Sequence, residues 1–134
     1  MVTTALHPNQ FQVNEAWIAF QLNDVPIQTI DDGDFNCIAL MDAASLFIFT
    51  VGHVPINAVD ISKLESRRML KQAHAHNGEM PKTLYIPSEQ TANNLALEAQ
   101  RQKVTVVRVP EHQLQHFIGE AREEFKEHFG GGSV

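Results

Sequence analysis

Two neighbouring apolar runs constrain the fold of this chain more than any other feature. Residues 35–42 (FNCIALMD) and 46–54 (LFIFTVGHV) each have the length of a strand, and only three residues separate them. So short a connection predicts an antiparallel hairpin, with Asp42 at the favoured first position of its turn. Both faces of each run are largely apolar, which is typical of strands covered on both sides. We therefore expect two adjacent strands, both in the interior of a sheet.

The sequence after this hairpin alternates between helical and strand patterns. Ser62 followed by Glu65 predicts a capping box and a helix that reaches about His76. The later elements are predicted in the order strand 83–87, helix capped by Ser88 with Glu89 in its first turn, strand 104–109 and helix 111–129. Because strand–helix–strand units cross over with a fixed hand, the last two strands are predicted to be parallel, with 104–109 away from an exposed edge.

The sequence before the hairpin is more ambiguous. Residues 17–22 (WIAFQL) and 25–30 (VPIQTI) flank Asn23-Asp24, which predicts a first hairpin. A short helix with Asn14 as its N-cap is the alternative for residues 14–22. The strand interpretation gives an antiparallel β-β-β start followed by α-β-α-β-α. The predicted class is therefore α/β (α+β) with a mixed sheet.

Length and composition predict a single domain. The chain has 134 residues, of which 43% are hydrophobic and 19% charged, so it can bury a core without a disulfide or a metal. Cys37 stands alone in an apolar run, which predicts a buried thiol in the reducing cytoplasm. No run is long enough for a membrane helix, and the start lacks a signal-peptide pattern. We expect a loose arm (1–14), one domain (15–129) and a flexible tail (130–134).

Charge is divided unevenly along the chain. Residues 1–57 contain six acids and no base, which argues against nucleic-acid binding by the sheet region, because such binding depends on lysine and arginine. The first helix carries a basic stripe: Lys63, Arg67, Arg68, Lys71 and His74. This stripe is either a solvated helix face or a site for a phosphate, RNA or an acidic partner. The partner predicted from the charge split is a second copy, in a homodimer that also uses an apolar patch of Phe11, Trp17 and Phe20.

The element order over residues 17–129 resembles the ribonuclease H-like fold, the core also used by integrases and transposases. The hairpin CIALMDAASLFIFTV, with Asp42 and Ser45 at its turn, resembles the second-to-third strand hairpin of integrase cores. The resemblance implies a nuclease with one acid within the first strand and another at the end of the fourth. Here WIAFQL contains no acid, and the fourth strand ends in Pro87-Ser88 with Glu89 just beyond. Without two converging carboxylates we expect neither a pair of metal ions nor metal-dependent nuclease activity.

Two weaker patterns suggest metal binding and are better explained otherwise. Asp32, Asp34 and Asn36 resemble the start of a calcium loop, but the glycine and glutamate required at its sixth and twelfth positions are missing. His112 and His116 have the spacing of a metal pair on a helix, without a third ligand. We expect a solvated turn and a solvated helix face, and therefore no metal and no cofactor.

Two functions remain open from the sequence. The first is a non-catalytic binding or protein-interaction domain that forms a homo-oligomer. The alternative is an enzyme with a pocket at the carboxyl ends of the parallel strands, around Ser88, Glu89 and Glu111, because ligands collect there in open α/β sheets. The second form of this alternative is a degenerate ribonuclease H-like nuclease, with Asp42 as a further candidate acid.

Overall fold

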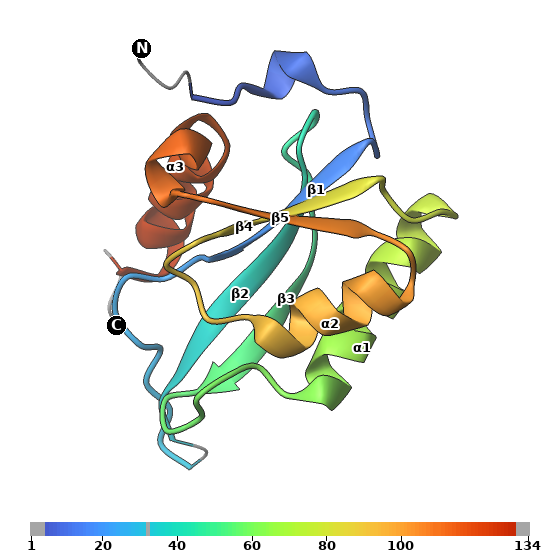
Figure 1. The fold of residues 1–134 in the computed structure, drawn as a ribbon. Helices are drawn as coiled ribbons and strands as arrows, with labels where there is room; N and C mark the ends of the chain where they lie inside the picture. The colour runs from blue at the N-terminus through green and yellow to red at the C-terminus, as the bar shows by residue number, and fades with distance from the viewer. Residues whose placement is uncertain (1–4, 32, 131–134) are drawn as a thin grey trace.

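The computed structural model describes residues 5–31 and 33–130 and contains one five-stranded mixed sheet. Its strands are β1 (Ala16–Gln21), β2 (Phe35–Asp42), β3 (Ile48–Pro55), β4 (Thr83–Pro87) and β5 (Thr105–Val109). They lie in the order β3-β2-β1-β4-β5 (Figure 1). The pairs β1–β2 and β2–β3 are antiparallel, and β1–β4 and β4–β5 are parallel. The predicted fold class and the strand form of residues 17–22 are confirmed.

Helices cover both faces of this sheet. On one face lie α1 (Lys63–Asn77) and α2 (Asn93–Arg101), and on the other a 3-10 turn, η2 (Glu111–Leu114), leads into α3 (Gln115–Phe125) (Figure 1). Short turns precede and follow them, η1 (Pro8–Gln10) and the π-helical η3 (Lys126–Gly130). Because strand side chains alternate between faces, Trp17 and Ala19 join the apolar cluster beneath α1 and α2, while Ile18 and Phe20 join the cluster beneath α3.

Three predicted strand positions were wrong. Residues 25–30 form no strand and make a single bridge, between Ile27 and Phe35, because β2 and β4 already take both edges of β1. The strands β3 and β5 lie at the two edges of the sheet, whereas both were expected away from an edge. The apolar side chains of β3 are covered by α1 on one face, which explains why its sequence resembles that of an interior strand.

The predicted helix starts were correct for α1 and wrong for α2. Ser62 Oγ accepts the Glu65 N–H at 3.0 Å, and Gly78, with a φ of 85°, ends the helix. Ser88 does not cap α2, because the N-cap position of that helix is Ala92, and the Ser88 N–H donates to the Val109 carbonyl and extends the sheet ladder. The helix α2 begins five residues later, and Asp60 Oδ2 accepts the Asn94 N–H at 2.9 Å, so a carboxylate distant in sequence supplies its cap.

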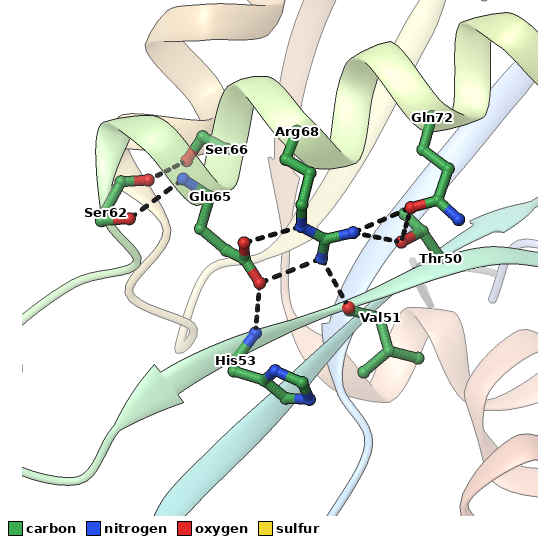
Figure 2. A network of polar contacts seen from close by, with 8 residues as sticks. All are labelled: Thr50, Val51, His53, Ser62, Glu65, Ser66, Arg68 and Gln72. Atoms are coloured by element: carbon green, nitrogen blue, oxygen red, sulfur yellow. Dashed lines mark hydrogen bonds and ion pairs between the residues drawn. The ribbon is translucent and has the colours of Figure 1, made fainter. Parts of the chain in front are cut away.

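The outer edge of β3 is closed by two side chains of α1 (Figure 2). The His53 N–H donates to Glu65 Oε2 at 2.9 Å, and Arg68 Nη2 donates to the Val51 carbonyl at 2.8 Å. The two side chains also pair with each other at 2.7 Å, and this hydrogen bond lowers the pKa of Glu65. Because the Glu65 carboxylate is engaged with His53 and Arg68, only one half of the predicted capping box forms, the hydrogen bond from the Glu65 N–H to Ser62 Oγ. Exposed strand edges promote association between chains, so this ion pair protects the sheet.

Residues 5–14 of the expected arm are held against the domain. The Leu6 N–H donates to the Gln113 carbonyl at 3.0 Å, and the Phe11 ring contacts Tyr85 and Phe117. Residues 1–4, Asp32 of the acidic turn and residues 131–134 of the expected tail lie outside the described residues. Among the helices of the described ranges, none has the combined length and apolarity of a membrane span.

Candidate functional site

The carboxyl ends of β4 and β5 bring three of the predicted site residues together. Ser88 and Glu89 follow β4 directly, and Glu111 follows β5. Glu89 Oε1 accepts the Glu111 N–H at 3.0 Å, so the two loops are tied to each other. The predicted neighbourhood of Ser88, Glu89 and Glu111 is therefore present as a cluster.

Asp42 lies at the other end of the sheet, beside Trp17 near the start of β1. Its side chain is 1% exposed, and both carboxylate oxygens accept hydrogen bonds. The donors are the Asn14 N–H at 2.6 Å, the Ala44 N–H at 3.2 Å, and the Ser45 N–H and hydroxyl at 2.7 and 2.8 Å. Asp42 is thus a structural residue of the β2–β3 turn, and it does not converge with Glu89 or Glu111.

An arginine that sequence reasoning missed dominates the strand-end cluster. Arg122 of α3 donates to both carboxylate oxygens of Glu111, at 2.9 and 3.1 Å, and its Nε donates to the Gln21 carbonyl at 2.9 Å. Its guanidinium also lies 6.0 Å from the centre of the Phe20 ring. The hydrogen bond from Arg122 lowers the pKa of Glu111. Eleven residues separate the pair across a 3-10 turn and a helix, so no short-range pattern predicts it.

The carboxylates at these strand ends do not fit the binding of a pair of divalent cations. The Glu111 carboxylate is neutralised by Arg122, and Glu89 is bonded to a backbone N–H. The neighbouring strand β1 (AWIAFQ) contributes no carboxylate. Within the described ranges, no three His, Cys, Asp or Glu side chains are grouped so that they could hold a metal ion.

A cavity of about 270 Å³ opens beside this cluster, between β1, β2 and the loops that precede α1 and α2. Its polar lining comes from Gln21, Asn36, Asp60, Glu89, Gln90 and Thr91. Both oxygens of Asp60 already accept backbone N–H groups, from Ile61 and Asn94. The cavity therefore offers side-chain amides and the Glu89 carboxylate, one oxygen of which already accepts the Glu111 N–H. These groups suit hydrogen bonding to a small polar ligand more than nucleophilic chemistry.

The basic stripe on α1 is narrower than predicted. Arg68 turns toward β3, as described above, and leaves an exposed row of Lys63, Arg67 and Lys71 at four-residue intervals. This basic row borders a groove of about 380 Å³ lined by Arg67, Lys71, His74, Met80 and Gln102. Arg67 pairs with Glu98 of α2 at 3.4 Å, while its side chain remains 56% exposed. The basic row is thus an accessible cationic surface.

The predicted apolar dimer patch was wrong. Trp17 and Phe20 are both 0% exposed, because β1 is the central strand and is covered on each face. Cys37 is a buried free thiol as expected, and burial raises its pKa. His112 and His116 are exposed; His112 belongs to the 3-10 turn, and the His116 ring lies 4.8 Å from that of His7.

Comparison with known proteins bears on the fold. No family model matches the chain, and no curated protein matches it in sequence. A chain of the simian T-cell lymphotropic virus intasome in complex with PP2A regulatory subunit B56 gamma superposes with a TM-score of 0.55 and 12% identity, over 95% of this chain and 43% of that one. The fold is ribonuclease H-like. The HTLV-2 integrase catalytic core domain in complex with magnesium (dimeric form) gives a TM-score of 0.46 and 9% identity, over 88% and 76% of the two chains.

The chain spans less than half the length of the intasome chain it resembles, and at 12% identity the likeness extends to the fold alone. What the chain binds or catalyses must therefore be argued from its own residues.

The Glu111–Arg122 pair predicts a dependence of stability on pH. The folded pKa of Glu111 lies below its ordinary 4.5, so its stabilising contribution is complete above that pH and is lost as the pH falls through the folded pKa. Glu111→Gln should lower the free energy of unfolding by about 1–2 kcal/mol at pH 7, a value limited by partial solvent screening, and by less at pH 3. Urea unfolding from pH 3 to 7 measures this, with exposed Glu123→Gln as the control. An equal loss at both pH values would contradict the ion-pair interpretation.

Proposed function

We propose that this chain is a non-catalytic protein-binding domain on a ribonuclease H-like core, and that its basic row binds an acidic segment. The position of Arg122 is the observation that carries the proposal. Its guanidinium lies at the carboxyl end of β1, bonded to the Gln21 carbonyl and to Glu111. This fixed cation disfavours the binding of a metal cation at the same place. The contacts at the strand ends therefore stabilise the fold and are poorly suited to metal-dependent chemistry.

The distribution of charge supports the binding half of the proposal. Residues 61–104, which include α1 and α2, contain seven bases and four acids, whereas residues 1–60 contain seven acids and no base. The exposed basic row and its groove are therefore a cationic surface on an acidic chain. Three cations in a row, one of them already paired with Glu98, match a short acidic peptide better than a nucleic-acid strand, because nucleic-acid affinity grows with the number of phosphates contacted.

An enzyme with its pocket at the strand ends is the second candidate. The observation that favours it is the cavity of about 270 Å³ beside Glu89. A degenerate nuclease is a special case, in which Glu89 and Glu111 act together despite the pairing of Glu111 with Arg122.

Fluorescence anisotropy with a labelled ten-residue polyglutamate peptide tests the proposal. We expect Arg67→Glu/Lys71→Glu to weaken binding by about tenfold or more at low salt, since two attractive pairs become repulsive. Lys82→Glu/Lys126→Glu changes the net charge equally at two lysines that belong neither to the basic row nor to the lining of its groove, and it should weaken binding by no more than about twofold.

Equal losses in the two double variants would show that only net charge matters, which would overturn the proposal. Nucleic-acid cleavage with magnesium or manganese that is abolished by Glu89→Gln would favour the second candidate.

A further inference from the structure

We infer that the acidic partner of the basic row is a second copy of this chain, which docks through an acid-rimmed groove between α3 and the β2–β3 turn. This inference rests on the proposed function, because it names the partner of the same basic row. The acid-rimmed groove has a volume of about 270 Å³. Its apolar lining includes Met41 and Phe117, and Glu120 and Glu124 of α3 also line it.

The spacing of charge on α1 matches that of the acid-rimmed groove. Glu120 and Glu124 are four residues apart on α3, and Arg67 and Lys71 are four residues apart on α1. Residues at this interval project from one side of a helix, about one turn apart. Two helices brought together therefore place both cations opposite both carboxylates at once. Exposure of all four residues leaves them accessible to a partner.

An apolar residue beside the basic row fits the apolar lining of the acid-rimmed groove. Leu64 lies three residues before Arg67 on α1, and 77% of it is exposed. So exposed a side chain gains little free energy from burial of its apolar surface in the isolated chain. Insertion of its side chain between Glu120 and Glu124 would cover it with Met41 and Phe117, while the charged side chains pair around it.

The two surfaces lie on opposite faces of the sheet, which decides how they can meet. The helix α1 packs on the cluster that contains Trp17, and α3 packs on the cluster that contains Ile18 (Figure 1). One molecule therefore cannot bring its own basic row to its own acid-rimmed groove. A two-fold dimer cannot form both contacts either, so the copies associate front to back, and the assembly grows with concentration instead of stopping at two.

Charge-swap variants test this arrangement by sedimentation velocity. Arg67→Glu/Lys71→Glu makes both surfaces acidic, and Glu120→Lys/Glu124→Lys makes both basic. Each variant alone should be monomeric, and an equimolar mixture should associate, because each basic surface then meets an acidic one. The wild type should associate over roughly 10 to 500 µM, as expected for a contact held largely by exposed ion pairs, and less so at high salt. Leu64→Ser should weaken wild-type association, and circular dichroism checks that every variant is folded.

A wild type that is monomeric throughout this range, or a mixture that does not associate although both variants are folded, would overturn the inference. Association of either variant alone as strongly as the wild type would also overturn it. Binding of the polyglutamate peptide separates the two levels. If the peptide binds the basic row while the charge-swapped mixture stays monomeric, the second copy is the wrong partner and the proposed function stands. If the peptide does not bind and the mixture also stays monomeric, the proposed function and the further inference are both wrong.

Discussion

Replacement of Asp42 by alanine is expected to lower the free energy of unfolding by about 3–5 kcal/mol, and thus the midpoint of thermal unfolding by roughly 10 °C or more. The carboxylate is buried and accepts three backbone N–H groups and one hydroxyl. Alanine would remove all four hydrogen bonds to a charged group that is itself only 1% exposed, and hydrogen bonds to charged groups are among the most costly to lose. Chemical unfolding monitored by circular dichroism measures the loss.

Ser45→Ala is the matched control for Asp42→Ala. It removes the hydroxyl that donates to Asp42 Oδ2 and leaves the backbone donors in place. The hydroxyl also accepts the Phe47 N–H at 3.3 Å, but Ser45 is exposed, so water can replace these contacts and we expect a loss of about 1 kcal/mol. If Asp42→Ala proves no more destabilising than Ser45→Ala, the structural role assigned to Asp42 is wrong, and its carboxylate becomes a candidate for chemistry again.

Replacement of Trp17 by alanine is expected to cost about 3–5 kcal/mol in the free energy of unfolding, which is the usual range for removing a large aromatic side chain from a core. Trp17 is fully buried beneath α1 and α2, its ring lies 5.0 Å from that of Phe49, and its Nε1–H donates to Asn14 Oδ1 at 2.7 Å. The loss should be the same at every protein concentration, because the side chain belongs to the core. Urea unfolding at two concentrations tenfold apart measures both quantities.

Trp17→Phe separates packing from hydrogen bonding at this position. Phenylalanine keeps an aromatic ring in the core but lacks the N–H that donates to Asn14, so a smaller loss is expected than for alanine. A loss for Trp17→Ala that disappears as the concentration rises would instead restore Trp17 as an interface residue.

Local patterns in the sequence were sufficient for the framework of the fold. The spacing of the runs that became β2 and β3 predicted their hairpin, and Ser62 predicted the first turn of α1, because tight turns and helix caps depend on residues only a few positions apart. The alternation of helices and strands after Ser62 then predicted the parallel strands β4 and β5.

The errors all concern partners that are distant in the sequence. Residues 25–30 have the composition of a strand, but the edges of β1 are taken by β2 and by β4, which lies about 40 residues beyond β2. Ser88 has the chemistry of a helix cap, but its backbone continues the sheet ladder beside Val109, and α2 begins only at Asn93. Arg122 meets Glu111 only once α3 has packed beneath β1. Such competitions are decided by tertiary contacts, which propensity and periodicity do not contain.

The ion pair between Glu65 and Arg68 also bears on how the chain folds in a crowded solution. The hairpin of β2 and β3 is local and can form early, but its outer backbone groups at Val51 and His53 are satisfied only when α1 has docked. Until then a newly made chain exposes the unpaired edge of a largely apolar strand to its neighbours. Because α1 follows β3 in the sequence, we expect it to cover this edge within the same chain, and the short connection of residues 56–62 favours that docking over pairing between two nascent chains.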